Sequence, residues 1–196
     1  MFLPRAVAIA AICCVAVFAS DELTVYELLA PATHSFAITY DFYTSHAGAP
    51  YLFNPIRRGS VATDERVIDA ATGKNLQFHV VSADDARQHG LQGKVSADSY
   101  IQVTLARPVP RGGEARVRIF KTYKDAASYS FDGDDIVFQR SLGIKRNIIV
   151  LPSGYELTGC GAPGIVSTAP DGRIRVSFVN DRDDELMVKL RGRLLK

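Results

Sequence analysis

The feature that most constrains this chain is the alternation of apolar and polar residues with a period of two. Phe36, Ile38, Tyr40 and Phe42 share one parity, and the residues between them are smaller or polar. The same alternation recurs over residues 76–80, 101–105, 115–119, 174–178 and 186–190. A period of two gives a strand with one face on a core and one face in water, which is typical of antiparallel sheets.

Glycine and proline mark the breaks between these segments. The breaks lie at Ala71–Lys74, Pro110–Gly113, Pro152–Gly154 and Pro170–Gly172. Glycine supplies a positive φ and proline presets φ, so each break predicts a β-hairpin turn.

Together these patterns predict an all-β fold: an antiparallel β-sandwich of about ten strands with one short helix. The helix is expected at Ala83–His89, where Asp84 and Asp85 would lie favourably at its N-terminus. We expect residues 20–196 to form one β-sandwich domain. The alternative is two immunoglobulin-like halves, 20–90 and 91–196.

The first nineteen residues have the pattern of a secretory signal peptide. Arg5 precedes an uncharged run from Ala6 to Ala19, and Val17 and Ala19 supply small residues for cleavage after Ala19. A retained membrane anchor is less favoured, because a span needs about 20 residues. Lipidation at Cys13 or Cys14 is also disfavoured, because neither follows a small residue. The prediction is a secreted or periplasmic protein with no stable membrane span after processing.

Composition narrows the classes of partner. The chain of 196 residues is 47% hydrophobic, so it has enough apolar material to fold. Its net charge is +2, which gives no electrostatic case for nucleic-acid binding. Arginine strongly outnumbers lysine, a bias associated with GC-rich bacterial genomes.

No residues stand in the spacing of a known catalytic or metal-binding motif. His34, His46, His79 and His89 include no pair in a ligand spacing, and His79 has the outward parity of its strand. We therefore predict no catalytic residues, no metal site and no cofactor.

Two charged features have more than one interpretation. The acidic clusters Asp132–Asp135 and Asp181–Asp184 are expected to be turn-forming carboxylates, with calcium binding left open. Five basic residues are expected on the outward faces of their strands, where they could form a stripe if the strands are neighbours, although scattered surface charge is the commoner outcome. They are Arg116, Arg118, Lys121, Arg173 and Arg175.

Cys160 is the only cysteine left after removal of residues 1–19, so no intramolecular disulfide can form. A thiol exposed in an oxidising compartment reacts or pairs. We therefore expect Cys160 to be largely buried, lined by Leu157, Ala162, Ile165 and Val166, and we expect no disulfide-linked dimer.

The segment Val25–Thr39, read as Val-Tyr-Glu-Leu-Leu-Ala-Pro-Ala-Thr-His-Ser-Phe-Ala-Ile-Thr, carries a family resemblance. It resembles the first hairpin of the N-terminal β domain of glycyl-aminopeptidase-like metallopeptidases, over about 20 residues. The hairpin at Leu151–Glu156 is similar to ones in uncharacterised secreted bacterial β proteins. The resemblance implies a non-catalytic β module, because the His-Glu-x-x-His helix of the peptidase domain is missing.

The function expected from the sequence is a secreted or periplasmic, non-enzymatic β-sandwich module that binds an unknown protein or glycan partner. The alternative is a small secreted hydrolase with a site assembled from distant strands, because catalytic triads are assembled in space and not along the chain.

Overall fold

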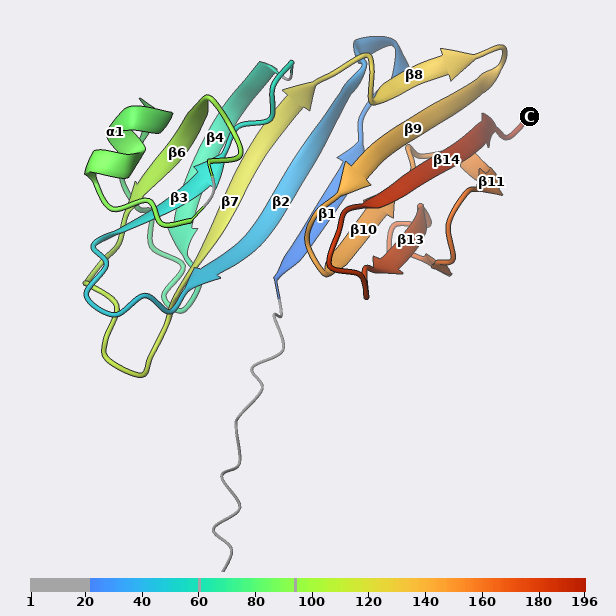
Figure 1. Ribbon diagram of the computed structural model, residues 1–196. Coiled ribbons are helices and arrows are strands. Elements are labelled where there is room, and N and C mark those ends of the chain that lie inside the picture. Colours follow the sequence, from blue (N-terminus) through green and yellow to red (C-terminus); the bar gives the residue numbers. More distant parts are fainter. Residues whose placement is uncertain (1–21, 60, 94) are drawn as a thin grey trace, which may run out of the picture.

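The computed structural model describes residues 22–59, 61–93 and 95–196. The predicted signal peptide, residues 1–19, lies outside them. Within the described ranges the chain is mostly strand, which confirms the all-β prediction (Figure 1). The strands are β1 Leu23–Leu28, β2 Ser35–Thr44, β3 Tyr51–Pro55, β4 Val61–Asp69, β5 Phe78–Ser82, β6 Ser99–Thr104, β7 Ala115–Lys124, β8 Tyr129–Asp132, β9 Asp135–Leu142, β10 Arg146–Val150, β11 Tyr155–Cys160, β12 Ile165–Thr168, β13 Ile174–Val179 and β14 Leu186–Leu194.

These strands form three sheets. The largest has seven strands in the order β12-β13-β10-β1-β2-β7-β4. A four-stranded sheet has the order β11-β14-β9-β8, and a three-stranded sheet has the order β3-β6-β5. The pairing of β1 with β10 is parallel, so the expectation of a purely antiparallel fold needs this correction. The predicted first hairpin is present, because β1 pairs with β2 in antiparallel register.

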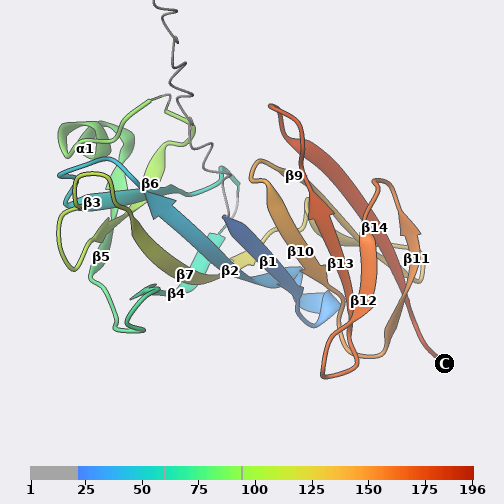
Figure 2. The same cartoon turned by 90° about the horizontal axis from the view of Figure 1, so that it is seen from below.

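Both smaller sheets pack on the same face of the seven-stranded sheet, side by side (Figures 1 and 2). The inward side chains of β2 show this directly. Phe36 and Ile38 belong to the core beneath the four-stranded sheet, whereas Phe42 packs into the core beneath the three-stranded sheet. Tyr40, which lies between them, contacts both cores. The four-stranded and three-stranded sheets therefore meet along a seam above the seven-stranded sheet.

The short helix is confirmed as α1, Ala83–Gln88. Ser82 caps it, since its side chain accepts a hydrogen bond from the backbone N–H of Asp85. Ala86 packs with Ala97 and Tyr100 in a third, small cluster. A single-turn helix, η1, spans Pro31–Thr33. No helix within the described ranges is long and apolar enough to cross a membrane.

Two of the four predicted hairpins are wrong. The turn at Pro170–Gly172 does join the paired strands β12 and β13. Pro110–Gly113 and Pro152–Gly154 instead carry the chain from one sheet to another. At Ala71–Lys74 the chain does reverse into a short antiparallel hairpin. Ile68 forms a bridge with Asn75, flanked by backbone hydrogen bonds from Asp69 N–H to Lys74 and from Leu76 N–H to Val67, and β5 then joins the three-stranded sheet. Turn chemistry fixes where the chain bends, but the packing of apolar faces decides which sheet it enters.

Strand pairs cross the boundary between residues 90 and 91. β1 pairs with β10, β2 with β7, and β3 with β6. These pairs favour a single unit over two halves, and the division into domains stays a prediction.

Candidate functional site

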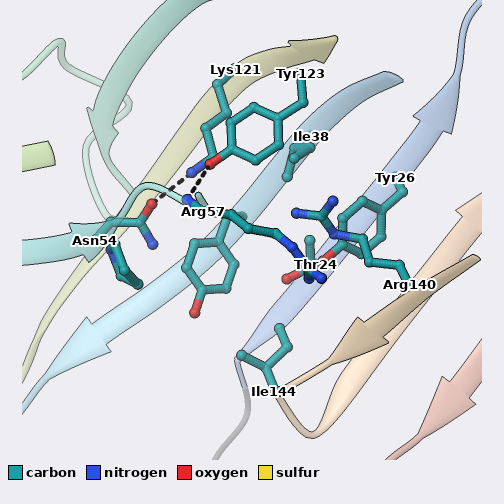
Figure 3. A pocket seen from close by; sticks show the side chains of 12 residues that line it. Thr24, Tyr26, Ile38, Asn54, Arg57, Lys121, Tyr123, Arg140 and Ile144 are labelled. Carbon is teal, nitrogen blue, oxygen red and sulfur yellow. Dashed lines mark hydrogen bonds between the residues drawn. The ribbon is translucent and has the colours of Figure 1, made fainter. Parts of the chain in front are cut away.

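The seam between the two covering sheets holds a cavity of about 140 Å³, which we call the seam pocket. The seven-stranded sheet forms its floor, the end of β3 forms one side, and the end of β9 with the following loop forms the other (Figure 3). It is lined by Thr24, Tyr26, Ile38, Tyr40, Asn54, Pro55, Arg57, Lys121, Tyr123, Arg140, Gly143 and Ile144.

Sheet register places the floor residues. Tyr26 on β1 lies opposite Ile38 on β2, and Ile38 lies opposite Lys121 on β7. Residues directly opposite each other in an antiparallel pair point to the same face. The inward parity of β7 thus runs from Val117 and Ile119 through Lys121 without interruption.

Lys121 is a buried cation, with 6% of its surface exposed. Its Nζ donates a hydrogen bond to Oδ1 of Asn54 at 2.8 Å and lies 4.9 Å from the centre of the Tyr123 ring. Burial, with a further contribution from Arg140, lowers the pKa of Lys121 to about 8, and Glu65 opposes this shift. The ammonium therefore stays mostly protonated at pH 7.

Arg140 is the second buried cation, on the β9 side of the seam. Its Nη1 lies 3.2 Å from Oδ2 of Asp125 and donates to Oγ of Ser128 at 3.1 Å. The guanidinium also lies over the rings of Tyr26, Phe36 and Tyr123, at 5.3–5.7 Å from their centres. An ion pair on one side and aromatic rings on the other fix its position.

Arg57 forms the rim of the pocket and is exposed. Its backbone N–H donates to the hydroxyl of Tyr123 at 3.4 Å, and its Nη1 donates to the backbone oxygen of Ser141 at 3.4 Å. Figure 3 shows its side chain running from the loop after β3 across the mouth towards Arg140. Arg57 thus bridges the two sides of the seam.

Three tyrosine hydroxyls complete the polar lining. Burial raises the pKa of Tyr26, Tyr40 and Tyr123 above the ordinary value, so these groups are neutral at physiological pH. The lining thus combines cations and hydroxyl donors, and none of its twelve residues is a carboxylate.

The four histidines do not come together. Nδ1 of His34 lies 2.9 Å from the backbone oxygen of Tyr129, and Nδ1 of His89 lies 2.9 Å from Oε1 of Gln102. His46 and His79 are exposed. Among the residues that the structure describes, no group of three or more His, Cys, Asp or Glu side chains could hold a metal ion.

The first acidic cluster, Asp132–Asp135, is the turn of the β8–β9 hairpin. Asp132 pairs with Arg191, and Asp135 lies 3.0 Å from Nε of Arg193. The side chains of Asp181–Asp184 are exposed in the loop before β14. Arginine side chains thus pair with both ends of the first cluster.

The basic residues form no continuous stripe. Strands β7 and β13 are separated by β2, β1 and β10. Arg118 pairs with Asp41, and Arg173 pairs with Glu27 at 2.9 Å. The prediction that Lys121 faces outward with Arg118 is wrong. Lys121 shares the alternate positions of β7 with the apolar residues Val117 and Ile119, and this pattern is the sequence signal that it faces the interior.

The prediction of a buried Cys160 is wrong, because Cys160 is exposed. It is the last residue of β11, an edge strand, and its thiol donates to the backbone oxygen of Ala162 at 2.9 Å. Two of its expected covering residues, Ile165 and Val166, are themselves 70% and 53% exposed. These residues are close to Cys160 in the sequence but do not cover it, because β12 belongs to the seven-stranded sheet and β11 to the four-stranded sheet.

A second recess, of about 240 Å³, lies between the ends of β2 and β3 and the loop after α1. It is mainly aromatic. The ring of Tyr51 lies 6.4 Å from that of Phe53 and 5.8 Å from that of His89. Phe42 and Tyr43 also line this recess.

The sequence matches no protein-family profile and no curated protein. Solved structures do match it. A two-domain M1 zinc metallopeptidase mutant bound to L-tryptophan and the M1 zinc metallopeptidase from Deinococcus radiodurans each superpose with a TM-score of 0.52 at 9% sequence identity. The match covers 87% of this chain but only 41% of the peptidase chain. The chain thus has the fold of a part of these peptidases, which confirms the resemblance predicted from its first hairpin.

Proposed function

We propose that this protein is a secreted or periplasmic, non-enzymatic β-sandwich module that binds a protein or glycan partner. The observation that carries the proposal is the seam pocket. Its polar groups are held in place before any ligand arrives, because Asn54 fixes Lys121 and Asp125 fixes Arg140. Preorganised polar groups in a small recess are typical of a binding site.

The contacts of His34, His89 and Cys160 favour binding over catalysis. A nucleophile needs a base within about 2.6–3.2 Å. His34 and His89 contact a backbone oxygen and an amide instead, and the thiol of Cys160 contacts a backbone oxygen. A hydrolase assembled from distant strands is the competing proposal, and the experiment below separates the two.

The test is a pull-down and a glycan array with residues 20–196. Arg57→Gln is the informative variant, because Arg57 is exposed and lines the seam pocket. Arg58→Gln is the matched control, because Arg58 is also exposed and does not line it. We expect capture of a specific partner that Arg57→Gln weakens and Arg58→Gln preserves. Absence of any partner, together with hydrolase turnover that one substitution abolishes, would contradict the proposal.

The location can be tested separately. The full chain is expressed in a bacterial host, and the product is fractionated and sequenced from its N-terminus. We expect an exported product that begins at Ser20. A cytoplasmic product that keeps Met1 would refute secretion and leave the binding proposal untouched.

A further inference from the structure

We propose that the seam pocket is a carboxylate site, in which Lys121, Arg57 and Arg140 bind an acidic group of a protein partner. This inference rests on the proposed binding function and names the group that is recognised. It begins from the balance of charge around the cavity.

The cavity is lined by three cations and no carboxylate. Asp125 pairs with Arg140 and offsets one positive charge. The charge of Lys121 has a neutral hydrogen-bond partner, Asn54, and is almost wholly removed from water. Glu65 on β4 acts on this charge, but it neither lines the cavity nor hydrogen-bonds to Lys121. A buried charge with no anion in contact is costly, so an anion entering the cavity would relieve that cost.

The hydrogen-bonding groups also fit an acceptor. An ammonium has three N–H donors, and the structure gives Lys121 one hydrogen bond, to Asn54. A carboxylate offers about four acceptor sites and donates none. A sugar hydroxyl must both donate and accept, and this lining is rich in donors. The chemistry therefore favours a carboxylate over a neutral sugar, and hence a protein over a neutral glycan.

The size of the cavity limits the ligand to one small group. A cavity of roughly 150 Å³ holds a molecule as large as benzene, and the seam pocket has about 140 Å³. Ile38, Pro55 and Ile144 supply apolar walls. These walls suit the short aliphatic stem of an acidic side chain or the last residue of a chain.

The charged surroundings of Lys121 make binding depend on pH. Arg57, just after β3, and Arg140 on β9 line the pocket beside it, and Glu65 acts on it from β4. The remaining titratable groups around the pocket are Tyr26, Tyr40 and Tyr123, all neutral at pH 7. Glu22, directly before β1, acts on Tyr40. A bound carboxylate adds a negative charge beside Lys121 and must raise its pKa.

The experiment uses three probes of nearly equal shape with residues 20–196. N-acetylglutamate α-amide carries a side-chain carboxylate, N-acetylglutamine carries an α-carboxylate, and N-acetylglutamine amide carries neither. Binding and the pKa of Lys121 are followed by NMR. We expect one of the two acids to bind and raise the pKa of Lys121 by about one unit, which corresponds to about ten-fold tighter binding to the protonated form. The neutral amide should cause no shift. The acid that binds identifies the source of the carboxylate.

Variants locate the effect. Lys121→Met should weaken acid binding by about ten-fold or more, because a charged hydrogen bond is lost. Lys74→Met, at an exposed turn, should leave it unchanged. If Lys121→Met does not fold, Arg57→Gln on the exposed rim replaces it, with an expected loss of about three-fold or more.

Two results would overturn the inference: neither acid binds, or inorganic phosphate alone binds. These results are separate from failure of the proposed function. A partner captured equally well by wild type and Lys121→Met would preserve the binding module and refute the carboxylate site. Acid binding with no captured partner, together with hydrolase turnover that one substitution abolishes, would preserve the carboxylate site and refute the binding module.

Discussion

Two regions on one face of the seven-stranded sheet differ in what they bury. Beneath the four-stranded sheet the inward side chains are apolar and aromatic, and Phe36 lies 5.3 Å from Phe138, ring centre to ring centre. At the seam the same strands bury Lys121 and Thr24. Strand β7 shows the contrast over two residues, because Ile119 is fully buried in an apolar core and Lys121 borders the pocket.

The difference follows from what lies opposite each side chain. A residue beneath a covering sheet faces an apolar layer. A residue at the seam faces the ends of two sheets, where loops and strand ends bring polar groups such as Asn54 and Asp125. Strand parity therefore decides which residues are buried, and the position of the covering sheets decides whether a charge can be buried there.

The largest expected effect comes from breaking the apolar region with Phe138→Ala. Phe138 is 1% exposed and its ring lies against Phe36 and Tyr26. Truncating a buried phenylalanine costs about 3–5 kcal/mol, because transfer energy is lost and a cavity remains. Urea unfolding followed by circular dichroism measures this loss. Gln139→Ala, at the neighbouring exposed position, should change stability by less than about 0.5 kcal/mol. A loss below about 1 kcal/mol for Phe138→Ala would show that this core is loosely packed.

At the seam, in contrast to the apolar core, the free energy of unfolding should depend on pH. The pKa of Lys121 is lowered to about 8 in the folded protein, against 10.5 for an ordinary lysine. Between these values the unfolded chain binds more protons, so stability rises with pH. From pH 8 to pH 10 the free energy of unfolding should gain about 2–3 kcal/mol from this group.

The measurement is the difference in unfolding free energy between wild type and Lys121→Met from pH 7 to pH 10. Tyr26, Tyr40 and Tyr123 have raised pKa values, so their contribution to stability falls above about pH 10. That fall is common to both proteins and cancels in the difference. A difference that does not change with pH would mean that Lys121 is well solvated.

The sequence predicted the strands better than it predicted their neighbours. Alternation located strands such as β2 and β13, and the acidic residues Asp84 and Asp85 supported the prediction of α1. The same alternation also indicates that Lys121 and Arg140 face inward, because each has the parity of the buried residues of its strand, β7 or β9. The pocket itself could not be predicted, because it depends on how the three sheets pack, and turn residues do not encode that.

A smaller effect is expected far from both regions, at the cap of α1. The hydroxyl of Ser82 accepts from the backbone N–H of Asp85 at 3.1 Å. Ser82→Ala should cost about 1 kcal/mol in urea unfolding, since one N–H at the helix start loses its partner. Ser82→Asp is the matched control and should retain most of the stability. Because the cap lies outside the seam pocket, neither variant should alter carboxylate binding. Altered binding would mean that α1 and the seam are coupled.

The smallest effect on stability is expected at Cys160. By its register with β14 this residue has inward parity, but no sheet within the described residues covers it, so it separates the two conditions for burial. Cys160 lies opposite the buried Leu190 across the β11–β14 pair, yet it is exposed, because β11 is an edge strand and no part of the chain that the structure describes covers its end. Cys160→Ala should therefore change the free energy of unfolding by less than about 0.5 kcal/mol. A thiol reagent should label the native protein at a rate close to that of the urea-unfolded chain, because no folding step limits access. Labelling slower by a factor of about 100 would mean that a cover forms over the end of β11 in solution.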